Sequence, residues 1–101
     1  MNFLHRFEDS AIKRFNMHLF KAEQMMEIVD ACEAAGLRIY GFDGFRLLGE
    51  SIQPLMEYSP DYSDVKDIEK IYMMARLFLR EAANLELLLE IVVGETENEL
   101  I

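Results

Sequence analysis

The stretch GLRIYGFDGFRLLGESIQP, residues 36–54, holds four of the chain's five glycines and its clearest strand and turn signals. Residues 37–42 are rich in β-branched and aromatic side chains with an alternating pattern, which predicts a strand. Asp43 and Gly44 then form a strong turn dipeptide. We therefore expect the strand to end at this dipeptide.

The second half of the stretch predicts a hairpin. Residues 45–48 and 52–55 are largely apolar and flank residues 49–51, Gly-Glu-Ser, which suit a three-residue loop. Pro54 has no N–H to donate to a neighbouring strand. We therefore expect the last strand of the hairpin to lie at an edge of the sheet.

A stripe of apolar residues precedes this stretch and predicts a helix. Apolar side chains recur at spacings of three and four between Ile12 and Val29, and Asp9-Ser10 offers an N-cap. Gly36 is placed to end the helix in a left-handed conformation. The pattern supports the helix best over residues 21–35.

The beginning of this predicted helix has an alternative. Phe15, Met17 and Leu19 alternate with other residues and would also suit a short strand, with a break in the helix between residues 16 and 20. The sequence leaves both possibilities open.

The C-terminal part predicts a second helix and a last strand. Ser63 or Asp64 can cap a helix whose apolar face repeats every three or four residues up to Ala82. After Asn84 the apolar residues alternate, which predicts a half-buried strand over residues 85–93. One continuous helix is the competing interpretation, and we prefer helix then strand because that helix would be unusually long.

These elements predict the fold class α+β: an N-terminal helix, a short hairpin in a small antiparallel or mixed sheet, a second long helix and a C-terminal strand. A chain of 101 residues fits one domain. We assign residues 1–94 to this domain and residues 95–101 to an acidic C-terminal tail.

The net charge of −9 is the most informative property of the composition. It disfavours binding to nucleic acid, which requires Lys and Arg at the phosphates, and to an anionic membrane. It favours a basic protein partner, because opposite fields accelerate association. The acidity is uneven: residues 50–69 contain six acids and one base, and residues 81–101 contain six acids and no base.

Targeting and redox features indicate a cytoplasmic protein. No apolar run approaches the length of a membrane span, and the first residues lack the apolar core and cleavage site of a secretory signal. Cys32 is the single cysteine, so no internal disulfide forms, which fits a reducing compartment.

No pattern of catalytic, cofactor-binding or metal-binding residues stands out, and we expect a protein that is not an enzyme and uses no cofactor. His5 and His18 lack converging ligands for a metal. Asp43 with Glu50 is an acid/base candidate that we reject, because carboxylates near turns are usually only solvated. The glycine spacing matches neither a P-loop nor a dinucleotide motif.

Residues 57–64, EYSPDYSD, are the strongest candidate for a binding surface. Tyrosines are stiff contact groups that recur in interface cores, and here they alternate with carboxylates suited to Lys and Arg. The alternative is an ordinary solvated loop whose tyrosines fold back onto the domain. Elsewhere, five methionines suit either an adaptable binding surface or gap filling in the core: Met25, Met26, Met56, Met73 and Met74.

The layout resembles small immunity proteins of bacterial toxin systems, the antidotes to nuclease colicins and to toxins of contact-dependent growth inhibition. The resemblance lies in residues 34–37, AAGL, the strand of residues 39–44, IYGFDG, and the hairpin with residues 52–54, IQP. It covers about residues 21–55. It implies a protein that occludes the active cleft of a cationic nuclease toxin and takes the place of RNA phosphates.

From this resemblance we expect a partner-binding site made of carboxylates and aromatic side chains. The expected phosphate surrogates are five carboxylates: Asp43, Glu50, Glu57, Asp61 and Asp64. The expected anchors are three aromatic residues: Phe45, Tyr58 and Tyr62. The alternatives are an acidic inhibitor of phage type and a homo-oligomeric structural or regulatory module, such as a homodimer.

Overall fold

The computed structural model describes residue 7, residues 11–14 and residues 17–95. The predicted cap at Asp9-Ser10 and most of the predicted acidic tail lie outside these residues. The elements follow one another as β1 (Ile12–Arg14), β2 (Met17–Lys21), α1 (Ala22–Ala34), β3 (Leu37–Leu48), β4 (Ser51–Leu55), the 3-10 helix η2 (Met56–Tyr58), α2 (Ile68–Ala83) and β5 (Leu88–Glu95).

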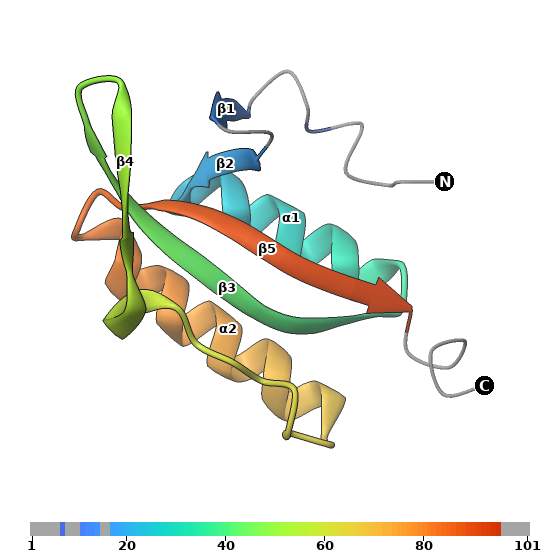
Figure 1. Cartoon of the computed structure of the whole chain (residues 1–101). Helices are drawn as coiled ribbons and strands as arrows, with labels where there is room; N and C mark the ends of the chain where they lie inside the picture. The colour runs from blue at the N-terminus through green and yellow to red at the C-terminus, as the bar shows by residue number, and fades with distance from the viewer. Residues whose placement is uncertain (1–6, 8–10, 15–16, 96–101) are drawn as a thin grey trace.

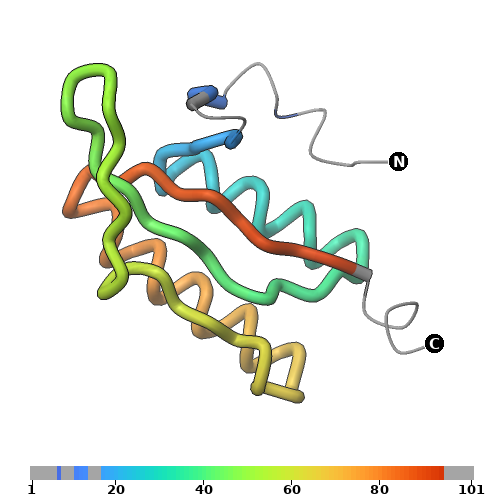
Figure 2. The backbone as a smooth tube through the Cα atoms, viewed as in Figure 1, coloured from blue at the N-terminus to red at the C-terminus, as the bar shows by residue number. Residues whose placement is uncertain are grey.

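The described strands form one sheet in the order β1-β2-β5-β3-β4, and each neighbouring pair is antiparallel. Both helices lie behind this sheet in the view of Figure 1, and the β3–β4 hairpin projects beyond it. The predicted α+β class is confirmed. The chain path in Figure 2 shows that β5, the last strand in sequence, lies between β2 and β3 in the sheet.

The predicted turn at Asp43 and Gly44 is wrong, because β3 continues through both residues to Leu48. Asp43 pairs with Glu90 of β5, and Gly44 pairs with Leu89 on one side and Leu55 on the other. Gly44 is required here for another reason: a Cβ at this position would collide with the backbone of Tyr58. Long-range pairing therefore overrides the local turn preference.

The predicted hairpin is present, with a shorter loop. Leu48 pairs with Ser51, which leaves Gly49 and Glu50 as a two-residue loop instead of the predicted three. Gly49 has φ +62°, as the first residue of a type II′ hairpin turn requires. The edge position expected from Pro54 is confirmed, since β4 pairs only with β3 within the sheet.

The predicted long N-terminal helix is wrong in its first part. Two short strands, β1 and β2, stand in place of its first turns, and α1 begins at Ala22. Leu19 and Phe20 are adjacent in sequence and almost fully buried, but they belong to two different apolar clusters. Their side chains therefore point to opposite faces of the sheet, as successive side chains of a strand do. The part over residues 21–35 is confirmed, and Gly36, with φ +70°, follows the end of the helix as predicted.

The second helix begins later than expected. Asp67, not Ser63 or Asp64, is its N-cap, and the Asp67 carboxylate accepts hydrogen bonds from the backbone N–H groups of Glu69 (3.0 Å) and Lys70 (3.3 Å). The helix ends at Ala83 and is followed by β5. The prediction of helix then strand is confirmed.

The main core lies between the helices and the sheet. Phe42 of β3 is its centre: its ring stacks on Phe78 (centroids 5.4 Å apart) and meets the Tyr62 ring edge to face (6.2 Å). Arg76 of α2 holds the two helices together by donating to Asp30 and Glu33 of α1 at 2.8 Å each. Cys32 is fully buried in this core.

Candidate functional site

The face of the sheet opposite the helices is the candidate site, and we call it the open face. Side chains of a strand alternate between faces, so the cross-strand register shows which residues share this one. Ile39, Phe42, Leu89 and Ile91 belong to the helix-covered core. The open face carries three directly opposite pairs of β3 and β5: Phe45–Leu88, Asp43–Glu90 and Gly41–Val92.

One end of the open face is a small apolar cluster that is already closed. Leu19, Phe45 and Leu88 are its buried centre, with exposures of 0%, 7% and 5%. Ile12, Met17 and Ile52 pack around them. The strands at the two edges of the sheet therefore cover this end, and it presents little apolar surface.

The other end is acidic. Asp43 and Glu90 lie directly opposite one another, and like charges in this position repel. Partial burial raises the pKa of Glu90, the Asp43 carboxylate raises it further, and His18 opposes the shift. The pair is therefore electrostatically unfavourable in the free protein.

A third carboxylate, that of Asp61, joins this end from the loop before α2. The loop pairs with β3 through hydrogen bonds from Tyr62 N–H to the Tyr40 carbonyl (2.7 Å) and from Phe42 N–H to the Pro60 carbonyl (3.1 Å). Gly41 permits this approach, because a Cβ there would collide with the Pro60 carbonyl oxygen.

Four further hydrogen bonds hold the loop in place. The Arg38 guanidinium donates to the backbone carbonyls of Tyr62 (3.3 Å), Ser63 (2.8 Å) and Val65 (2.8 Å). Ser63 N–H donates to Asp61 Oδ1 (2.9 Å), and hydrogen bonding from Ser63 lowers the pKa of Asp61. The Asp61 carboxylate is therefore held in place and ionised at neutral pH.

Between Asp43 and Asp61 the surface is hollowed into a cavity of about 340 Å³, and Met56, Pro60 and Val92 also line it. Met56 is 83% exposed and Val92 is 45% exposed. We call the surface formed by Asp43, Asp61, Glu90, Met56 and Val92 the acidic groove. It combines carboxylates with exposed apolar groups, as sites for Lys and Arg side chains do, because the stems of those side chains are apolar.

His18 is the basic side chain whose charge acts on Glu90, and it only partly offsets the combined effect of burial and of Asp43 on the pKa of that carboxyl. Arg38, at the beginning of β3, donates to backbone carbonyls and lies over the Tyr40 ring. Three carboxylates with one opposing imidazole keep the groove acidic, which suits an external cation.

The predicted aromatic anchors are placed differently from the expectation. Tyr62 is 3% exposed and belongs to the main core, where burial raises its pKa to about 12. Phe45 is buried in the apolar cluster of the open face. Tyr58 packs partly against the main core. We therefore remove Tyr62 and Phe45 from the contact surface, since a partner cannot reach their rings.

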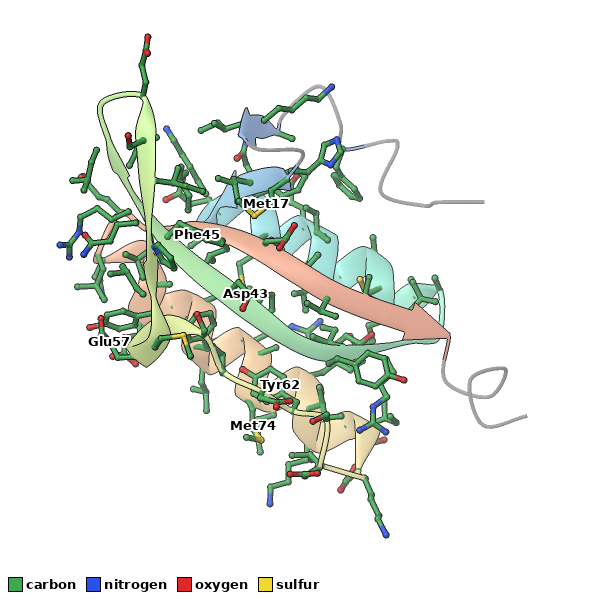
Figure 3. The ribbon with its side chains drawn as sticks, in the orientation of Figure 1. Met17, Asp43, Phe45, Glu57, Tyr62 and Met74 are labelled. Atoms are coloured by element: carbon green, nitrogen blue, oxygen red, sulfur yellow. The ribbon has the colours of Figure 1, made fainter. Side chains whose placement is uncertain are left out.

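The five predicted carboxylates do not share one rim. Asp43 and Asp61 line the same cavity. Glu50 lies in the loop at the tip of the hairpin, Glu57 lies in η2, and Asp64 lies in the segment before α2. Figure 3 shows Asp43 on β3 and Glu57 beyond the base of the hairpin.

Sequence reasoning missed Glu90, although the alternation of residues 85–93 already placed it opposite the buried residues. Its partnership with Asp43 depends on the register of two strands 47 positions apart, which a single sequence does not give. Of the five methionines, Met56 and Met73 are exposed, and Met25 is fully buried.

The described residues contain no group of three or more His, Cys, Asp or Glu side chains that could hold a metal ion. No helix in the described part of the chain is long and apolar enough to cross a membrane. Comparisons of the chain with protein-family models, with curated proteins and with solved structures found no match. The proposals below therefore depend on geometry and charge.

Proposed function

We propose that this chain is a non-enzymatic inhibitor that binds a cationic protein through the acidic groove. The partner that fits best is a cognate nuclease-type toxin, which the chain would neutralise in the cytoplasm of the producing bacterium as an immunity protein. The net charge of −9 and the resemblance of residues 21–55 to immunity proteins support this function. The groove supplies the carboxylates that would replace RNA phosphates in the toxin.

The observation that carries the proposal is the Asp43–Glu90 pair. Two carboxylates directly opposite one another destabilise a sheet by a few tenths of a kcal/mol up to about 1 kcal/mol. A Lys or Arg side chain from a partner removes this repulsion and gains charge-assisted hydrogen bonds. The free protein carries a cost that binding relieves, which is typical of a binding surface and not of a structural one.

The test uses the product of the gene adjacent to that of this chain as the candidate toxin. Cells that express this product under an inducible promoter are expected to die, and co-expression of the chain is expected to restore survival. Asp43→Asn combined with Glu90→Gln removes two charges while the shapes are kept, and we expect it to lose protection.

The matched control is Glu69→Gln combined with Glu81→Gln, two exposed α2 residues outside the groove. It removes the same charge and is expected to protect like the wild type. Equal protection by both double variants, or no protection by the wild type, would contradict the proposal. Both double variants need equal cellular levels, which immunoblotting measures.

A self-associating module is the alternative that one observation favours. The hairpin exposes two adjacent leucines, Leu47 at 42% and Leu48 at 53%. A homodimer would bury them, and the association would be insensitive to salt because it is apolar. Sedimentation of the purified chain in low and high salt separates the two: we expect a monomer at both ionic strengths.

A further inference from the structure

Within residues 17–95, β2 pairs with only the first part of one edge of β5. The pairs are Phe20↔Leu89 and Lys21↔Leu88. β5 then continues to Glu95, paired with β3 on its other side. Figures 1 and 2 show β2 turning away near the beginning of β5, while β5 runs on along α1.

The hydrogen bonds of β3 reveal which way the backbone of β5 points. Phe42 N–H donates to Pro60 and Gly44 N–H donates to Ser59 Oγ (3.1 Å), so both point away from β5. Successive residues of a strand direct their backbone groups to opposite edges. Asp43 and Gly41 therefore point toward β5.

Their register partners on β5 point back toward β3, namely Glu90 and Val92. The residues between and beyond them, Ile91 and Val93, consequently direct their N–H and C=O groups to the other edge. Among residues 17–95, the register between β2 and β5 ends at Phe20↔Leu89 and does not reach Ile91 or Val93.

The outer edge of β4 and the edge of β5 at residues 91–93 differ in how readily their sequences would accept another strand. β4 carries Pro54, which lacks an N–H and blocks the addition of another strand. Residues 90–94 of β5, Glu-Ile-Val-Val-Gly, contain no proline and no lysine and are rich in β-branched residues. Residues 90–94 of β5 therefore lack two of the common protections against pairing with another chain, proline and lysine.

We propose that the β5 edge at Ile91 and Val93 receives an extended strand of a basic partner protein, which adds to the sheet beside the acidic groove. Four backbone groups, the N–H and C=O of these two residues, form its hydrogen bonds. The strand-like geometry of the edge selects an extended segment. The basic character of that segment rests on the proposed function, because it follows from the charge of the groove.

The register also assigns a side-chain pattern to the added strand. Residues opposite Ile91 and Val93 point to the helix side, since Ile91 and Val93 themselves pack there. Residues opposite Glu90 and Val92 point to the open face. The pattern that fits is therefore alternation, with Lys or Arg on the open face near Glu90 and apolar residues on the helix side.

The test uses a synthetic peptide of alternating lysine and valine, capped at both ends, and amide hydrogen exchange of the whole chain followed by NMR. In the free protein the amides of Ile91 and Val93 should exchange faster than those of Glu90 and Val92. The peptide should slow exchange at Ile91 and Val93 by about tenfold or more. Faster exchange at Glu90 and Val92, or no change with peptide, would overturn the proposal.

Two controls sharpen the result. The same peptide with N-methylated valines lacks the N–H groups that would face β5, and it should give no slowing. If it slows exchange equally, the peptide binds by charge alone and the edge is not used. A peptide of alternating glutamate and valine should bind more weakly, since Glu90 and Asp43 repel it.

The result can be separated from that of the proposed function. A toxin partner that binds through Asp43 and Glu90 but leaves the Ile91 and Val93 amides unprotected would overturn strand addition and leave inhibition standing. Peptide addition at this edge, together with failed protection of cells, would overturn inhibition and leave strand addition standing.

Discussion

The two faces of the sheet are built from the same strands but have opposite properties. On the helix-covered face, Ile39, Phe42 and Leu89 are at most 2% exposed and belong to one core. On the open face, Asp43 and Glu90 oppose one another, and Val92 beside them is 45% exposed. Neighbouring residues thus alternate between stabilising the fold and presenting charge.

This difference teaches how the chain separates stability from binding. Burial of apolar side chains on one face supplies the folding energy, so the other face can keep an unfavourable acidic pair. Substitutions on the first face should change stability, whereas substitutions of Asp43, Glu90 or Val92 on the second should change binding and alter stability little or upward.

The largest effect is expected at the centre of the covered face. Phe42→Ala removes a ring that stacks on Phe78 and contacts Tyr62, and it should lower the free energy of unfolding by about 3–5 kcal/mol. Val92→Ala on the open face should cost less than about 1 kcal/mol. Urea denaturation followed by circular dichroism measures both, and equal losses would show that the faces do not differ in this way.

A smaller loss is expected where the loop meets β3. Gly41→Ala places a methyl group against the Pro60 carbonyl oxygen, which must move, and overpacking of this kind costs about 1–3 kcal/mol. The displaced loop also carries Asp61, so partner binding should weaken as well. Unchanged urea stability together with unchanged affinity would show that the loop does not depend on this contact.

A loss of about 1 kcal/mol is expected when the N-cap of α2 is removed. Asp67→Ala removes the acceptor for two backbone N–H groups and should cost about 1 kcal/mol. Asp64→Ala, at a position that the sequence also offered as the cap, should change stability by less than about 0.5 kcal/mol. Thermal unfolding of the two variants compares these losses. A larger loss of stability for Asp64→Ala would show that Asp64, and not Asp67, caps α2.

The smallest effect has the opposite sign. The pKa of Glu90 is raised in the folded chain, so the folded state loses stability as pH rises above the ordinary value of 4.5 and through the raised pKa. Glu90→Gln removes this loss and should stabilise the chain at neutral pH by about 0.2–1 kcal/mol. The gain should vanish below the ordinary pKa, and a variant that is less stable at neutral pH would contradict the repulsion.

Local signals predicted the elements whose ends are set by local chemistry. Gly36 ends α1, Gly49 forms the hairpin turn and Pro54 marks an edge strand, each through its own backbone properties. The change of period after Asn84 likewise predicted the last strand.

The predictions were wrong where contacts between distant parts of the chain determine the local structure or the burial of a residue. Asp43-Gly44 has the composition of a turn, but pairing with β5 keeps it extended. Tyr62 has the composition of an interface residue, but packing against Phe42 buries it. The pairing of Asp43 with Glu90 depends on strand register, and the candidate site could therefore be predicted only in part.

The decisive measurement is the affinity of the purified chain for the adjacent-gene product, by calorimetry at low and high salt. The wild type should bind more weakly as salt rises, because exposed charges are screened. Asp43→Asn with Glu90→Gln should lower the affinity about tenfold to a hundredfold, as the loss of about 1.5–3 kcal/mol of charged hydrogen bonds implies, and should reduce the salt dependence. Affinity unchanged in this variant, with Glu69→Gln and Glu81→Gln as the matched control, would show that the open face is not the binding surface.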